Sequence, residues 1–205
     1  MIAIINYGSG NVGAIANIYK QLKIPVVISG DVGELETADR YILPGVGAFD
    51  ATMQYLNQSG IVSMLNDQVV SKKKKVLGIC VGMQILAESS EEGQLAGLGW
   101  IDGRVRRIDA SLLPSRHPKL PHMGWNSVAL RNEARLFDGV DLARGFYFLH
   151  GYYFDAKNPR DVVATVEYGA ELPCAVSSGN VFGMQFHPEK SHANGVMVFK
   201  NFAEL

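Results

Sequence analysis

Short apolar runs alternate with stretches of helical spacing in the first half of the chain. The apolar runs lie at residues 2–6, 25–28, 41–43 and 76–79. The helical spacing, in which apolar side chains recur every three or four positions, is seen at Ile15, Ile18 and Leu22 and again at Phe49, Met53 and Leu56. Strands of a parallel sheet are covered by helices on both faces and read as continuous apolar runs, so this alternation predicts an α/β fold. We expect an open, mostly parallel sheet with flanking helices.

The second half of the chain is richer in runs typical of strands. They lie at residues 104–108, 146–149, 162–166, 174–177 and 181–186, and a closing helix is expected over residues 195–203. The sequence contains no internal repeat, no low-complexity linker and no break in composition. A chain of 205 residues suits one domain of ordinary size, so we expect residues 1–205 to form a single domain.

Charge and cysteine content narrow the functional classes. The formal net charge is −1, so no general field attracts nucleic acid or an anionic membrane, and we expect neither as a partner. The two cysteines, Cys80 and Cys174, show no pairing pattern, and the first residues read as a strand rather than a signal peptide. No apolar run reaches the roughly 18 residues of a membrane span. These features predict a cytoplasmic protein with two free thiols.

One cysteine has the surroundings of a nucleophile. The segment Gly78-Ile79-Cys80-Val81-Gly82 directly follows an apolar run and has the form G-x-C-x-G, the thiol version of a nucleophile elbow. A sharp turn from strand to helix lifts such a side chain above the sheet edge, and glycines avoid a collision on both sides. The next N–H, from Val81, would face an oxyanion, and the following helix would favour a thiolate. Cys174 has no such setting and is predicted to be a small core residue.

A base and its orienting carboxylate are predicted near the end of the chain. His187 and Glu189 lie in Gln185-Phe186-His187-Pro188-Glu189, after a strand-like run. The residue before a proline favours extended geometry, and residues two apart in an extended chain face the same side. One imidazole nitrogen can then take the Cys80 proton while the other donates to the carboxylate. A His-x-Glu pair alone is a weak motif. It indicates a catalytic pair only in combination with the elbow cysteine in an α/β chain.

The glycine-rich loop Pro44-Gly45-Val46-Gly47 follows the third apolar run, at the edge where open α/β sheets bind ligands. It admits three interpretations: a phosphate cradle, a plain tight turn, or a second oxyanion donor beside Cys80. No GK[ST] follows the loop, which weakens the first of these. The sequence offers no cluster of metal ligands, and no cofactor is expected.

Together these segments resemble the class I (triad) glutamine amidotransferases, whose fold is flavodoxin-like. The matching stretches are residues 6–11, 43–49, 78–84, 121–126 and 185–191. They extend over essentially the whole chain. The loop 44–47 and the segment 121–126 carry a narrower resemblance, to the glutaminase subunits of imidazole glycerol phosphate synthases, because most relatives have Pro-Gly-Gly in the loop.

The resemblance implies roles for individual residues. Cys80, His187 and Glu189 match the catalytic triad. Val46 and Gly47 match an oxyanion strand in which the Val46 N–H must turn inward, beside the N–H of Val81. The positions that match the glutamine-binding site are Gln84, Glu92, His150, Gly151 and Tyr152. The positions that match the face toward the synthase subunit are Asn11, Trp125 and Lys190.

What the resemblance implies about function is hydrolysis of glutamine and transfer of the ammonia to a partner. The implied partner is a (β/α)₈-barrel cyclase subunit of histidine biosynthesis, in a heterodimer. Two alternatives stay open: a paralogue that supplies ammonia to a surface-polysaccharide amidotransferase, and a catalytically silent regulatory subunit. Relatives often have Ser or Thr where this chain has Gly151, so a hydroxyl that could contact glutamine is absent here.

Overall fold

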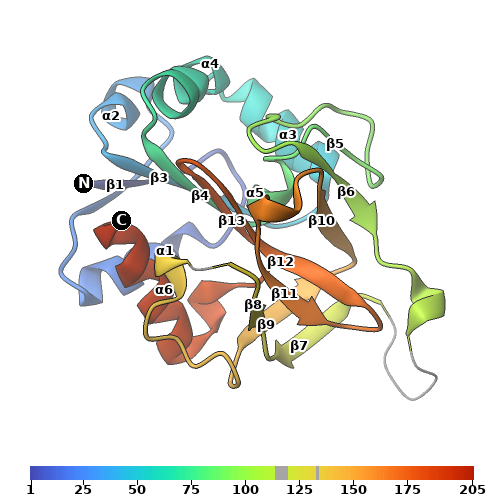
Figure 1. The fold of residues 1–205 in the computed structure, drawn as a ribbon. Helices are drawn as coiled ribbons and strands as arrows, with labels where there is room; N and C mark the ends of the chain where they lie inside the picture. The colour runs from blue at the N-terminus through green and yellow to red at the C-terminus, as the bar shows by residue number, and fades with distance from the viewer. Residues whose placement is uncertain (114–119, 133) are drawn as a thin grey trace.

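A mixed sheet forms the centre of the molecule. The structure, a computed structural model, describes residues 1–113, 120–132 and 134–205. Within these residues the main sheet has eight strands in the order β2-β1-β3-β4-β13-β12-β11-β8 (Figure 1). Their bounds are β1 Ile2–Ile5, β2 Val26–Ser29, β3 Arg40–Gly45, β4 Lys75–Cys80, β8 Ala129–Leu130, β11 Val162–Glu167, β12 Glu171–Ser178 and β13 Val181–Met184. The strands from β2 to β13 pair in parallel, whereas β12, β11 and β8 join antiparallel.

The first five positions of this sheet follow the doubly wound order of flavodoxin-like folds. The connection reverses direction between β1 and β3, and the carboxyl ends of β1, β3 and β4 therefore meet at one edge. This edge brings together the loop after β1, the glycine loop after β3 and Cys80 at the end of β4. The predicted α/β class is confirmed, and the sheet has the predicted parallel part beside Cys80.

Two small sheets extend the molecule beyond the main sheet. One has the order β10-β6-β5, with β5 Ser89–Ser90, β6 Gly103–Arg107 and β10 Tyr152–Ala156. The other pairs β7 (His122–Asn126) antiparallel with β9 (Phe146–His150). The sequence pattern missed β7 and β10, whereas the runs at 104–108 and 146–149 are strands as predicted.

Helices cover the main sheet on both faces. Figure 1 shows α1 (Val12–Gln21) and α6 (His192–Glu204) together on one side, and α3 (Phe49–Gln58) and α4 (Val62–Leu65) on the other. The remaining helices are α2 Val32–Glu36, the π-helical turn Asn66–Ser71, α5 Val81–Gln84 and the short 3-10 turns Ala110–Leu112, Arg135–Phe137, Pro159–Asp161 and Pro188–Lys190. The predicted helices match α1, α3 and α6. Among the described residues, no helix has the length and apolar character needed to cross a membrane.

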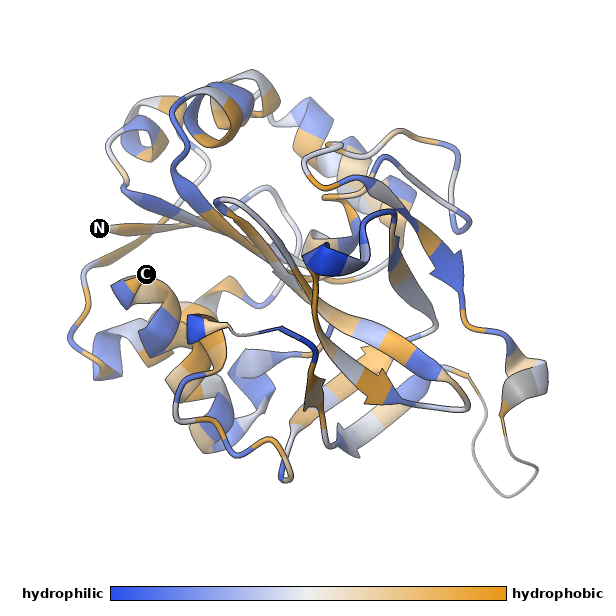
Figure 2. Cartoon of the chain, in the orientation of Figure 1, coloured by the Kyte–Doolittle hydropathy of each residue, from blue (hydrophilic) through white to orange (hydrophobic). Residues whose placement is uncertain are grey.

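The core lies between these layers. The strands at the centre of the main sheet are largely apolar, and the helices combine an apolar side with a polar one (Figure 2). Tyr19 of α1 packs edge-to-face on Phe199 of α6, with ring centroids 5.4 Å apart. Cys174 is fully buried in β12, as its apolar surroundings predict.

Candidate active site

Cys80 lies at a strained turn between β4 and α5. Its backbone has φ 55° and ψ −114°, a combination that L-residues rarely adopt. A Cβ atom on Gly82 would come within 1.8 Å of the Leu43 carbonyl oxygen, and one on Gly78 within 2.4 Å of the Gly82 oxygen. Both glycines are therefore required by close backbone approach, as predicted for an elbow, although the obstacle at Gly82 is strand β3.

The helix after the elbow is shorter than expected from the sequence. α5 contains only the four residues Val81–Gln84, so it has little macrodipole to offer the sulfur. The stabilisation of a thiolate that we expected from this helix is therefore small. As the first residue of the turn, Val81 has an N–H without an acceptor inside the helix, and it is free to serve an oxyanion.

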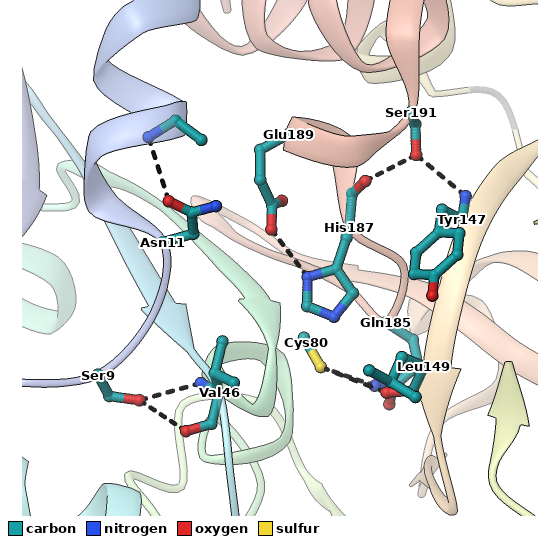
Figure 3. A network of polar contacts seen from close by, with 11 residues as sticks. Ser9, Asn11, Val46, Cys80, Tyr147, Leu149, Gln185, His187, Glu189 and Ser191 are labelled. Carbon is teal, nitrogen blue, oxygen red and sulfur yellow. Dashed lines mark hydrogen bonds and ion pairs between the residues drawn. The ribbon is translucent and has the colours of Figure 1, made fainter. Parts of the chain in front are cut away.

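His187 links the sulfur to a carboxylate. Its Nδ1 lies 2.9 Å from Glu189 Oε1, and its other ring nitrogen faces Cys80 (Figure 3). The side chains of His187 and Glu189 are only 4% and 2% exposed, so water does not compete for this pair. The contact is as predicted but the backbone is not: Glu189 lies in the 3-10 turn Pro188–Lys190, not in an extended segment.

The electrostatics of His187 suit a proton carrier beside a thiolate. Burial lowers the pKa of His187, but hydrogen bonds to Cys80 and Glu189 and the negative charges of both outweigh burial and raise the pKa to about 10. The backbone of His187 is also fixed, because its N–H donates to the Tyr147 oxygen at 2.9 Å and its carbonyl accepts from Ser191 Oγ at 2.7 Å.

Two further groups that the sequence did not reveal contact the sulfur. The Leu149 carbonyl oxygen of β9 lies 3.9 Å from Cys80 Sγ, and Gln185 Nε2 lies 3.8 Å from it. Gln185 is fully buried. The only sequence signal for Gln185 was its place two residues before His187, which puts it on the same side of an extended chain.

The glycine loop after β3 lies next to the loop after β1. Ser9 Oγ accepts a hydrogen bond from the Val46 N–H at 2.9 Å and lies 3.0 Å from the Val46 carbonyl oxygen. Figure 3 shows both Val46 backbone atoms directed at Ser9, away from Cys80. The Val46 N–H is thus engaged elsewhere, while Gly47, at φ 115°, keeps the freedom of a glycine.

A cavity of about 810 Å³ opens over the sulfur. Its walls include the triad residues Cys80, His187 and Glu189, the loop residues Val46, Gly47 and Val81, and the predicted glutamine-binding residues Gln84, Glu92, His150, Gly151 and Tyr152. The structure therefore brings together all residues for which the sequence predicted chemistry or substrate contact. The Glu92 carboxylate accepts the Phe49 N–H at 2.8 Å, at the start of α3, which holds a negative charge at the cavity wall.

His150 is held by a neighbouring histidine, His122, for which the sequence indicated no role. His122 Nδ1 lies 3.0 Å from His150 Nε2, and His150 Nδ1 lies 2.8 Å from the Tyr152 carbonyl oxygen. Because a carbonyl only accepts, His150 donates from Nδ1 and accepts at Nε2 from His122. Burial lowers the pKa of His122 to about 4 and that of His150 to about 3, so both rings are neutral near pH 7.

Comparison with known proteins identifies the family. The profile described as glutamine amidotransferase class-I matches residues 3–205. The imidazole glycerol phosphate synthase subunit HisH of Bdellovibrio bacteriovorus is 50% identical over 205 residues, and that of Leptospira interrogans is 47% identical, each covering 100% of both chains. The chain belongs to the class-I glutamine amidotransferases. A crystal structure of a glutamine amidotransferase, 18% identical, matches the fold with a TM-score of 0.72 over 100% of both chains.

In this class-I glutamine amidotransferase, two of the positions predicted to face a synthase are exposed and belong to the cavity wall. Asn11 and Lys190 line the cavity. Asn11 also caps α1 through a 3.3 Å bond to the Ala14 N–H. Trp125 is 43% exposed on β7 and stacks on His192, with ring centroids 5.4 Å apart.

Within the described part of the amidotransferase, no group of three His, Cys, Asp or Glu side chains is arranged to hold a metal ion. The polar groups around the sulfur are instead organised as donors and acceptors of protons. A nucleophile, a base and the backbone N–H of Val81 thus lie in one cavity, which suits the transfer of an amide nitrogen from glutamine.

Proposed function

We propose that this chain hydrolyses glutamine to glutamate and ammonia through Cys80, His187 and Glu189. The ammonia then passes to a separate synthase subunit of histidine biosynthesis. The observation that carries the proposal is the strained Cys80 in a cavity whose wall also holds the buried His187–Glu189 pair. The 50% and 47% sequence identity to subunits of imidazole glycerol phosphate synthase, over the full length of both chains, supports the pathway.

The reaction begins at the sulfur. The Cys80 thiolate attacks the side-chain amide carbon of glutamine, and the carbonyl oxygen becomes an oxyanion that the Val81 N–H stabilises. His187 donates its proton to the departing nitrogen, which leaves as ammonia, and a glutamyl thioester remains. His187 then takes a proton from water, whose oxygen attacks the thioester and releases glutamate and the Cys80 thiolate. Glu189 stays ionised throughout and stabilises the imidazolium.

Gln84, Glu92 and Tyr152 give the cavity polar groups that suit an amino acid substrate. The Glu92 carboxylate at the wall can attract the α-ammonium of glutamine. Gln84 offers an amide that can pair with the substrate amide. Gly151 has no side chain, so contacts with glutamine at this position come from the backbone.

The acceptor of the ammonia is a second subunit. We propose that residues 1–205 form one glutamine amidotransferase domain and that a (β/α)₈-barrel cyclase docks over the cavity mouth in a heterodimer. Asn11, Trp125 and Lys190 then face that subunit, and we place the reaction in the cytoplasm. Free ammonia would be protonated in water and lose its nucleophilic lone pair, which favours direct transfer between the two sites.

The test is replacement of the nucleophile. Cys80→Ala should reduce glutamine hydrolysis to background, with the fold retained, whereas Cys174→Ala removes the other buried thiol and should leave the hydrolysis rate within a few-fold. With the synthase subunit bound, Cys80→Ala should still form product from added ammonium salt. Glutamate release by Cys80→Ala at the wild-type rate would refute the proposed nucleophile.

A further inference from the structure

Gln185 is placed to act on the nucleophile directly. We infer that Gln185 is a positioning residue that donates a hydrogen bond from Nε2 to the Cys80 sulfur and favours the thiolate. This inference rests on the proposed function, because it assigns a role beside the proposed nucleophile. Its test measures the thiol itself and does not depend on glutamine hydrolysis.

The geometry places the amide and the imidazole on different sides of the sulfur. Gln185 Nε2 lies 3.8 Å from Cys80 Sγ, within the range of hydrogen bonds to sulfur. Figure 3 shows His187 and Glu189 on one side of Cys80, with Gln185 and Leu149 on another. Gln185 is fully buried, so no water competes for its donor. A buried amide needs partners for its polar atoms, and the sulfur is a partner of its nitrogen.

The orientation of the Gln185 amide is fixed by its neighbours. Gln185 Oε1 accepts from Gln84 Nε2 at 3.0 Å. Gln84 Nε2 also lies 3.5 Å from the Tyr152 carbonyl oxygen, which can only accept. If the Gln84 amide were flipped, its oxygen would face two other oxygens, Gln185 Oε1 and the Tyr152 carbonyl. If the Gln185 amide were flipped, its NH2 group would face the NH2 group of Gln84 and the bond between them would be lost. The network therefore directs Nε2 of Gln185 at the sulfur.

The Gln185 amide and the Leu149 carbonyl act in opposite directions on the sulfur. The Leu149 carbonyl can accept from the Cys80 thiol, but its oxygen repels a thiolate at the same place. The Gln185 N–H donates to either form and binds the charged one more strongly, because hydrogen bonds to an ionised acceptor are about twice as strong. Since α5 is one turn long, its dipole does not supply this stabilisation. Gln185 thus supports the thiolate that His187 forms.

The experiment is the pH dependence of Cys80 alkylation by iodoacetamide in the full-length chain. Mass spectrometry locates the label, and circular dichroism checks the fold. Gln185→Met removes the donor at similar length. We expect the midpoint of the alkylation profile to rise by about one pH unit, a roughly tenfold loss of thiolate below it. Gln68→Met, which removes another buried amide away from the cavity, should leave the profile unchanged.

An unshifted profile in folded Gln185→Met would overturn the inference, and so would an equal shift in Gln68→Met. If Gln185→Met does not fold, the same alkylation profile is measured for Gln185→Glu. This substitution keeps the size of the side chain and places an acceptor against the sulfur. We expect a larger upward shift in that variant, and an unshifted or lowered midpoint would contradict the role. Loss of the proposed glutaminase function in other assays would leave this measurement valid.

Discussion

At the scale of single residues, the proposed reaction has His187 carry a proton at the sulfur, to the departing nitrogen and from water, while Glu189 moves none. Glu189 contacts only the far side of the imidazole, at 2.9 Å from Nδ1, and does not reach the sulfur. Its effect on catalysis is therefore indirect, through the tautomer and charge of His187. This division of labour separates the two side chains experimentally.

Replacement of these two residues should give unequal losses. His187→Asn removes the base and acid, so we expect the rate of glutamine hydrolysis to fall by about four orders of magnitude. Glu189→Gln keeps a partner for Nδ1 but removes the charge, and we expect a smaller fall. The measurement is steady-state glutamate release with the synthase subunit bound. Equal losses in both variants would contradict the assigned roles.

The neutral histidines His122 and His150 make stability depend on pH in a definite direction. Both pKa values lie below the ordinary value near 6.5, so the unfolded chain binds protons that the folded chain does not. The contribution of these two histidines to the free energy of unfolding is therefore constant above pH 6.5 and falls as the pH drops from 6.5 toward 4. In this range each of the two histidines lowers the free energy of unfolding by about 1.4 kcal/mol for each pH unit of decrease.

His122→Asn should remove one of these two contributions while keeping a donor for His150. We expect the loss of stability between pH 6 and pH 5 to be smaller than in the wild type by roughly 1.4 kcal/mol. Urea unfolding at pH 7, 6 and 5 measures the difference. Parallel stability curves for the two proteins would show that His122 takes up its proton normally in the folded state.

At the scale of elements, the elbow depends on how closely α5 approaches β3. Gly82→Ala would place a methyl group 1.8 Å from the Leu43 carbonyl oxygen, and backbone cannot move aside cheaply. We expect a loss of stability on the order of 3 kcal/mol and a displaced Cys80. Gly13→Ala in α1 is the matched control, since nothing lies within 4 Å of the added Cβ. It should stabilise the helix by about 0.5–1 kcal/mol.

Thermal or urea unfolding of both variants gives the comparison. Equal stability of Gly82→Ala and Gly13→Ala would mean that the elbow can relax without cost. The sequence indicated this elbow because the glycines lie at fixed positions around Cys80. It did not indicate that the obstacle is a neighbouring strand, which is a contact between segments 39 residues apart.

The elements that the sequence predicted are those with a local signal. Continuous apolar runs gave the parallel strands, and helical spacing gave α1, α3 and α6. β7 was missed because His122–Asn126 mixes polar residues with a glycine, and β10 because only Gly151 separates it from β9. Gln185 and Ser9 were missed for another reason: their contacts with Cys80 and Val46 join distant segments. The place of Gln185 two residues before His187 does not indicate which group it contacts.

At the scale of the whole molecule, the loop after β3 can couple the reaction to the partner. The Val46 N–H is bound by Ser9 Oγ, so the proposed oxyanion site has the Val81 N–H but lacks its second donor. Loss of one such donor costs on the order of 100- to 1,000-fold in rate. A synthase subunit that docks over Asn11 and Lys190 would contact the loop after β1, because Asn11 lies two residues after Ser9. It could thereby shift Ser9, which binds the Val46 N–H.

We therefore predict that the isolated chain hydrolyses glutamine very slowly and accelerates when the synthase subunit and its acceptor ligand bind. The ligand can do so only if it favours the inward Val46 N–H over the one held by Ser9. Glutamate release is measured for the chain alone, with partner, and with partner plus ligand. Ser9→Ala removes the acceptor of the resting state. A hydrogen bond contributes about 1 kcal/mol, so this variant should be about fivefold faster when isolated and gain correspondingly less from the partner. Equal wild-type rates under all three conditions would show that the loop is already set for catalysis.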